Sequence, residues 1–123
     1  MSQFILLCAM ILHGSFSPDT LHRRVLLFGT AASPLVKDQW QLLQNDSSGL
    51  EERDLEIEIV PPGSLLYKTF AVSPVDHFTI ILVGKDGGEK YRSTELTSTT
   101  QLFALIDAMP MRKAEIRNQK KNH

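Results

Sequence analysis

Cysteine and histidine carry much of the redox, nucleophilic and metal chemistry of proteins, and this chain has few of either. Its 123 residues include one cysteine, Cys8, and four histidines at positions 13, 22, 77 and 123. A single cysteine cannot form an internal disulfide, a Cys-x-x-Cys redox pair or a cysteine-rich zinc site. The histidines show no metal-ligand spacing with one another or with carboxylates. We therefore expect no metal site and no cofactor.

Two hydroxyl residues, Thr30 and Ser33, lie where an apolar run gives way to a helical pattern. Ser33 is followed by Pro34, a pair typical of a helix N-cap and first helical residue. The free amides of a helix N-terminus favour an anion. His77 directly precedes another apolar run, so Thr30, Ser33 and His77 are candidate residues of a polar mouth. An enzyme could use these three groups, but spacing alone pairs no base with a nucleophile.

A glycine-rich segment, residues 84–88 (GKDGG), predicts a tight hairpin because glycine and aspartate tolerate positive φ. A phosphate-binding loop would lead from a strand into a helix, whereas residues 89–93 (EKYRS) have the composition of a polar strand. Four charged residues around this hairpin are candidates for a binding surface: Lys85, Asp86, Lys90 and Arg92. The alternative is that they protect an edge strand from pairing with another sheet.

The elements that must position these residues alternate along the chain. Residues 23–29 (RRVLLFG) form a continuous apolar run typical of a strand buried on both faces. Residues 34–45 have the pattern of a helix with one mostly apolar face. The residues of that face recur at helical spacing: Leu35, Val36, Gln39, Trp40, Leu42 and Leu43. Turn residues at 45–49 (NDSSG) are expected to end that helix. Residues 54–60 (DLEIEIV) alternate as a strand does, which predicts a parallel βαβ crossover.

The second half of the chain predicts a hairpin and a final helix. After the break at residues 61–63 (PPG) we expect a weakly helical segment over residues 64–70 and a strand over residues 78–84 (FTIILVG). The hairpin joins that strand to residues 89–93.

The final helix has a recognisable start and a break. Ser98 and Gln101 have the spacing of a capping box, and Pro110 should interrupt or kink the helix. Asp107 and Arg112, on either side of this break, are expected to form a buried ion pair that fixes the bend.

This order of elements predicts one α/β domain with a thioredoxin-like fold. A mixed central sheet would combine the parallel crossover with the antiparallel hairpin, and helices would cover both faces. In thioredoxin-like enzymes the reactive cysteine lies where the first strand meets its helix, but residues 30–34 (TAASP) contain no sulfur. Such enzymes also place a cis-proline before the strand equivalent to residues 78–84, where this chain has Asp76 and His77. We expect neither oxidoreductase nor peroxidase activity.

Three segments of the chain resemble one known family. They are residues 52–54 (ERD), residues 82–92 (LVGKDGGEKYR) and residues 102–112 (LFALIDAMPMR). They are similar to domain of unknown function 4174, a family found in short secreted bacterial proteins and in vertebrate secreted matrix proteins, including those with sushi repeats. The resemblance covers residues 21–117. It implies a thioredoxin-like fold and an exported protein, and it implies no reaction.

The amino terminus is typical of a secretory signal peptide. Residues 4–12 (FILLCAMIL) are too short to span about 30 Å of hydrocarbon as a helix, but their length suits the apolar region of a signal. We expect a signal peptide over residues 1–17 with cleavage before Pro18, which removes Cys8. The alternative is a buried first element. We thus expect a domain over residues 18–117, a basic tail over residues 118–123, a periplasmic or extracellular location, and no stable membrane insertion.

Charge is unevenly distributed although the formal net charge is only −1. Residues 1–60 hold four Lys or Arg and eight Asp or Glu, whereas residues 61–123 hold nine and six. The basic residues gather near the carboxyl end, where they could bind a polyanion such as an anionic glycan or simply keep the terminus soluble. No aromatic residues interleave them, so we do not expect nucleic acid as a partner.

Together these observations favour an exported, non-redox binding module whose partner is an unknown protein or an anionic glycan. An enzyme using Thr30, Ser33 and His77, and a cell-surface polyanion binder using the basic tail, remain alternatives.

Overall fold

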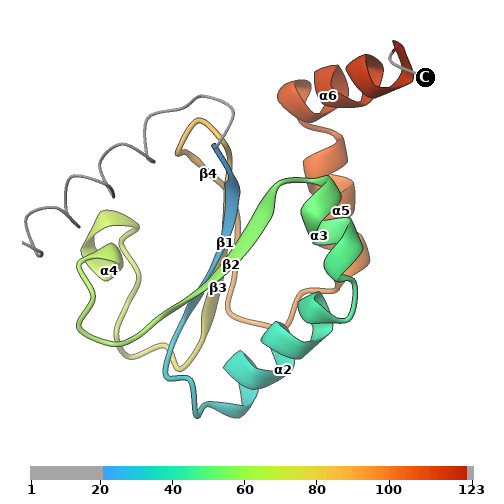
Figure 1. Ribbon diagram of the computed structural model, residues 1–123. Coiled ribbons are helices and arrows are strands. Elements are labelled where there is room, and N and C mark those ends of the chain that lie inside the picture. The colour runs from blue at the N-terminus through green and yellow to red at the C-terminus, as the bar shows by residue number, and fades with distance from the viewer. Residues whose placement is uncertain (1–20, 122–123) are drawn as a thin grey trace, which may run out of the picture.

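Four strands form one mixed sheet (Figure 1). The structure, a computed structural model, describes residues 21–121, so the predicted signal peptide and Cys8 lie outside the described residues. The strands are β1 (Arg23–Phe28), β2 (Leu55–Val60), β3 (Thr79–Val83) and β4 (Glu89–Ser93). Their order in the sheet is β2-β1-β3-β4.

The pairing of these strands confirms the predicted topology. β1 runs parallel to β2, with Val25 opposite Ile57, and antiparallel to β3, with Val25 opposite Leu82. β3 and β4 form the antiparallel hairpin, with a bulge between Leu82 and Val83. The sheet thus combines one parallel crossover and one hairpin, as the sequence indicates.

Helices cover both faces of the sheet. They are α2 (Pro34–Gln44), α3 (Ser47–Glu52), α4 (Leu66–Thr69), α5 (Thr99–Asp107) and α6 (Pro110–Lys121). In Figure 1, α2, α3 and α5 lie on one side of the sheet and α4 on the other, while α6 stands at the end where β1 begins.

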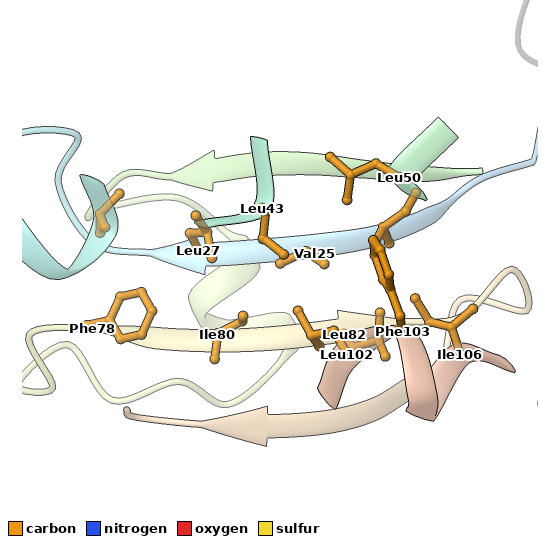
Figure 2. Close-up of a cluster of buried hydrophobic side chains, with 12 residues drawn as sticks. Val25, Leu27, Leu43, Leu50, Phe78, Ile80, Leu82, Leu102, Phe103 and Ile106 are labelled. Atoms are coloured by element: carbon orange, nitrogen blue, oxygen red, sulfur yellow. The ribbon is translucent and has the colours of Figure 1, made fainter. Parts of the chain in front are cut away.

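The core has two layers because the central strands are buried on both faces. Val25 and Leu27 of β1 face α2 and α5, where Leu43, Leu102 and Phe103 complete the larger cluster (Figure 2). The intervening residues of β1 point to the other face. There Leu26 and Phe28 pack with Ile81 and Val83 of β3 and with α4.

Residues 45–49 do not simply end α2, as predicted, because they also start a second helix. The side chain of Asp46 accepts a hydrogen bond from the backbone N–H of Gly49 at 3.1 Å and so acts as the N-cap of α3. Residues that favour turns are also those that favour N-caps, so the same composition fits both structures.

The buried face of α2 is narrower than its apolar pattern predicts. Val36, Gln39 and Leu43 are buried, whereas Leu35 and Leu42 are 37% and 40% exposed. Gln39 is fully buried because its side-chain amide exchanges two hydrogen bonds with the backbone of Thr97, at 2.9 and 2.8 Å.

The carboxyl-terminal helices follow the predicted start and break. Ser98 caps α5, its side chain accepting from the backbone N–H of Gln101 at 3.1 Å. α5 ends at Asp107 and α6 begins at Pro110. α6 is helical as far as Lys121, so most of the predicted basic tail belongs to a regular helix.

Candidate functional site

Thr30, Ser33 and His77 come together at the end of the sheet where the parallel strands β1 and β2 finish. All three line one open hollow of about 510 Å³. The rest of its lining is mostly apolar or rigid: Gly29, Pro34, Leu35, Pro62, Tyr67, Pro74 and Asp76. We call this hollow the mouth.

Gly29 is what allows the two sides of the mouth to approach each other. It follows β1 with φ of +152°, and its N–H donates to the carbonyl of Val60 at the end of β2 at 3.0 Å. A Cβ at this position would lie 2.9 Å from Val36 Cγ2 and 3.1 Å from the carbonyl oxygen of His77. Only glycine fits between these neighbours without displacing them.

The polar side chains of the mouth are not hydrogen-bonded to one another in the part of the chain that the structure describes. Among the described residues no hydrogen bond links His77 to Thr30 or Ser33, and the Ser33 side chain makes no capping bond to α2. Thr30 and His77 are exposed and Ser33 is half-buried. A nucleophile–base pair would require the two groups within hydrogen-bond reach, whereas here each polar side chain faces the hollow separately.

A second hollow, of about 300 Å³, contains three of the four predicted hairpin residues. Lys85, Asp86 and Lys90 line it together with Arg23 and residues 109–111. Lys90 Nζ lies 2.8 Å from Asp86 Oδ2, and the N–H of Gly88 donates to Asp86 Oδ1 at 2.9 Å. The hydrogen bond from Lys90 holds the pKa of Asp86 below its usual range.

Arg92, the fourth hairpin residue, lies apart from this hollow and ties β4 to the end of α4. Its guanidinium pairs with Glu89 at 2.7 Å and donates to the backbone carbonyls of Phe70 and Ala71. The Arg92 hydrogen bond lowers the pKa of Glu89. The structure therefore gives Arg92 partners of its own.

A buried ion-pair network occupies the opposite end of the sheet, where β1 begins. Arg23, only 1% exposed, forms two parallel hydrogen bonds to Glu115 of α6 at 3.1 and 3.2 Å and donates to the Arg53 carbonyl at 2.8 Å. Lys85 Nζ bridges Asp54 and Glu115 at 2.8 and 2.9 Å. Arg23, Lys85 and Asp54, from three different segments, are thus linked to α6 through Glu115.

The network continues through a second carboxylate, Asp107. Arg53 makes two hydrogen bonds to Asp107, at 3.1 and 3.0 Å, and its guanidinium carbon lies 4.0 Å from the centroid of the Phe103 ring. Arg112, 2% exposed, donates to the same carboxylate at 3.1 Å and reaches Glu52 at 3.3 Å. This confirms the predicted pair between Asp107 and Arg112.

Ionic contacts in the network outweigh the effect of burial on its charged groups. Burial alone would raise the pKa of Glu115, but hydrogen bonds from Arg23 and Lys85 bring it below its ordinary value. Burial alone would lower the pKa of Lys85, but its bonds to Asp54 and Glu115 raise it. Both groups are therefore stabilised in their charged forms.

Neither a metal cluster nor a membrane helix occurs in the part of the chain that the structure describes. Residues 21–121 contain no group of three or more His, Cys, Asp or Glu that could hold a metal ion. None of the described helices is long and apolar enough to cross a membrane.

The sequence matches a protein-family model described as Domain of unknown function (DUF4174) over residues 19–115. The chain belongs to the DUF4174 family. Sushi repeat-containing protein SRPX of Rattus norvegicus and SRPX of Homo sapiens are each 30% identical to it over 113 residues, covering 76% of this chain and 24% of the relative. The chain thus spans about a quarter of the length of these curated relatives.

Two solved structures share the fold of this DUF4174 domain. A structure titled as that of a malarial protein is 22% identical, with a TM-score of 0.54, and covers 70% of this chain and 94% of its own. Thioredoxin-2, titled as a component of malaria parasite protein secretion machinery, is 20% identical with a TM-score of 0.54, covering 72% and 84%. At these identities the likeness shows the thioredoxin fold alone.

The segments that resemble the DUF4174 family supply most of the ion-pair network. Residues 52–54 contribute three members, Lys85 comes from the hairpin segment, and Asp107 and Arg112 come from the last segment. The three segments that resemble the family therefore include residues that hold the helices of this DUF4174 domain to the sheet.

Proposed function

We propose that this DUF4174 domain is an exported binding domain without redox chemistry, and that its mouth receives a segment of a protein partner. The mouth carries this proposal: it is an open hollow, mostly apolar, at the point where thioredoxin-like enzymes place their reactive cysteine. Here that point is occupied by residues 30–34, which contain no sulfur.

Exposed apolar side chains at the mouth favour a protein segment over a small polar ligand. Val75, between two lining residues, is 81% exposed, and Leu35, which lines the hollow itself, is 37% exposed. Apolar side chains that are exposed together around a pocket can mark an interaction site, whereas single ones elsewhere on a surface are ordinary. An extended segment with one apolar side chain would bury these groups.

The rigid and polar parts of the mouth suit such a segment. Three prolines and Tyr67 line the hollow, so little side-chain freedom is lost when a partner binds. Thr30, Ser33 and His77 supply donors and acceptors for the backbone of the segment, whose polar groups would otherwise lose their bonds to water.

A peptide-binding experiment with matched variants tests this proposal. Random peptides displayed on phage are selected on the immobilised protein, and a recovered peptide is synthesised and titrated. Leu35→Gln should weaken its binding about tenfold, as expected for losing a buried aliphatic contact. Leu42→Gln, on the same helix and 40% exposed, should change binding less than about twofold.

Two results would count against the mouth as the binding site. One is equal weakening by Leu35→Gln and Leu42→Gln. The other is unchanged binding in the His77→Ala and Ser33→Ala variants, which should each weaken it about fivefold through loss of one hydrogen bond.

Export is tested separately by the mass of the protein recovered from its native host. We expect a chain that begins at Pro18. An intact Met1 on protein from the periplasm or medium would contradict signal cleavage.

A further inference from the structure

Helix α6 carries four cations on one face. Lys113, Arg117, Lys120 and Lys121 follow one another at intervals of four, three and one residues, which at 3.6 residues per turn keeps them within about 100° of the helix circumference. All four are exposed. Within residues 21–121 none of them forms an ion pair. We call these four residues the basic stripe.

The rotation of α6 is fixed by two charged residues on its opposite face. Arg112 is 2% exposed and binds Asp107 at 3.1 Å, and Glu115 binds Arg23 at 3.1 Å and Lys85 at 2.9 Å. Both lie roughly opposite the centre of the basic stripe on a helical wheel. Because these ion pairs hold the inner face of α6 against the domain, the basic stripe must face solvent.

The surroundings of the basic stripe keep it free for an external anion. Two acidic residues near α6 in the ion-pair network, exposed Glu52 and half-buried Asp54, already pair with Arg112 and Lys85. Figure 1 shows that the carboxyl end of α6 points away from the sheet. Four cations over about 12 Å of helix therefore lack a counter-charge among the described residues.

We infer that the basic stripe binds an anionic glycan chain. Residues 117–121 (RNQKK), which hold three of the four cations, contain no apolar or aromatic side chain, and Ile116 beside them is half-buried. The stripe therefore presents no exposed apolar group to a bilayer and no aromatic ring to nucleic-acid bases. This site is independent of the mouth, which lies at the other end of β1.

Retention on immobilised heparin, a sulfated glycan, tests the inference. Arg117→Gln combined with Lys121→Gln should weaken binding about tenfold, roughly threefold for each exposed ionic contact, and should lower the salt concentration at elution. The control, Lys37→Gln combined with Lys68→Gln, removes the same charge from exposed positions on α2 and α4 and should elute close to the unmodified protein. Equal loss in both double variants would overturn the inference.

A second variant tests whether binding requires the cations to be arranged on a helix or only requires a basic segment. Asn118→Pro preserves all four cations and the net charge but breaks α6 between them, so it should weaken retention about as much as the double substitution. Retention equal to that of the unmodified protein would overturn the stripe. Binding to vesicles of anionic phospholipid without binding to heparin would overturn the glycan as its partner. Loss of peptide binding at the mouth would leave these results unaffected.

Discussion

Arg112 shows how much a single buried charge can contribute to this fold. Its guanidinium is 2% exposed and is held by Asp107, Glu52 and the Glu52 carbonyl. Removing one partner of a buried ion pair costs several kcal/mol, although Asp107 keeps its bonds to Arg53. Arg112→Met should therefore lower the free energy of unfolding by about 3 kcal/mol, measured by urea denaturation.

Two comparisons show whether the guanidinium itself is responsible. Arg112→Lys keeps the charge but cannot reproduce the forked geometry, so it should recover less than half of the loss. Lys113→Met, at the exposed neighbouring position, should stay within about 0.5 kcal/mol of the unmodified protein. An Arg112→Met variant as stable as Lys113→Met would contradict a stabilising role for Arg112.

Replacing Gly49 by alanine should destabilise the protein, although alanine has the higher helix propensity. It lies in α3, where alanine usually stabilises by about 0.5–1 kcal/mol. However, a Cβ at this position would lie 2.5 Å from Phe103 Cε2 and 2.8 Å from Asp46 Oδ2. Because Arg53 packs on the same Phe103 ring, the ring cannot move freely. Gly49→Ala should therefore lower the free energy of unfolding by about 2 kcal/mol, and a stabilised variant would show that α3 has room to shift.

Helices α2 and α5 begin with the same residue type but with different capping. Ser98 accepts a hydrogen bond from the Gln101 N–H at 3.1 Å, whereas the Ser33 side chain makes no such bond. Ser98→Ala should therefore cost about 1 kcal/mol in thermal or urea unfolding, the usual value for a lost N-cap. Ser33→Ala should cost less than about 0.5 kcal/mol. Equal losses would mean that Ser33 caps α2 in solution, which would withdraw its hydroxyl from the mouth.

Strands and long helices could be predicted because their patterns are local. The apolar run of β1, the alternation in β2 and the residues 86–88 each specify one element without reference to distant residues. Helix α3 could not be predicted in this way, since Asp46 and its neighbours fit a turn as well as an N-cap. The exposure of Leu35 and Leu42 also depends on where β2 and α5 pack. The helical spacing of apolar residues carries no information about that packing.

The candidate sites show the same difference between local patterns, which could be predicted, and contacts between distant residues, which could not. Thr30 and Ser33 could be placed together because they are close in sequence, and His77 joined them through the predicted topology. The ion-pair network escaped prediction except for Asp107 and Arg112, which are five residues apart. The pair of Arg23 and Glu115 spans 92 residues, and the only local signal was an arginine at the start of an otherwise apolar strand.

The whole domain has two ends with different chemistry. The mouth, where β1 ends, is open and mostly apolar, and no hydrogen bond joins Thr30, Ser33 and His77 to one another among the described residues. The network, where β1 begins, joins α3, α5 and α6 through ion pairs to the start of β1, to Asp54 just before β2 and to Lys85 in the hairpin turn. The open end is the one where we propose that a partner binds, and the other end holds the helices in place and orients the basic stripe.

The carboxyl groups of the ion-pair network predict how the stability of the domain depends on pH. Burial alone would raise the pKa of Asp107 and Glu115, but hydrogen bonds from their cationic partners bring both below their ordinary values of 3.8 and 4.5. A carboxyl with a lowered folded-state pKa stabilises the protein above its unfolded-state pKa, and this contribution is lost as the pH falls through the folded-state value. The free energy of unfolding should thus be nearly constant from pH 7 to 5 and fall below about pH 4.

Glu115→Gln tests whether the network produces that acid sensitivity. The variant leaves Arg23 buried without its carboxylate, so it should be about 2 kcal/mol less stable at pH 7. Its stability should also fall less between pH 5 and pH 3, because one of the responsible carboxyls is gone. Glu95→Gln, at an exposed position that forms no ion pair among the described residues, should retain the original pH dependence. If the Glu115→Gln profile ran parallel to that of the unmodified protein, acid sensitivity would have to arise outside the network, and Glu115 would be a packing contact for α6.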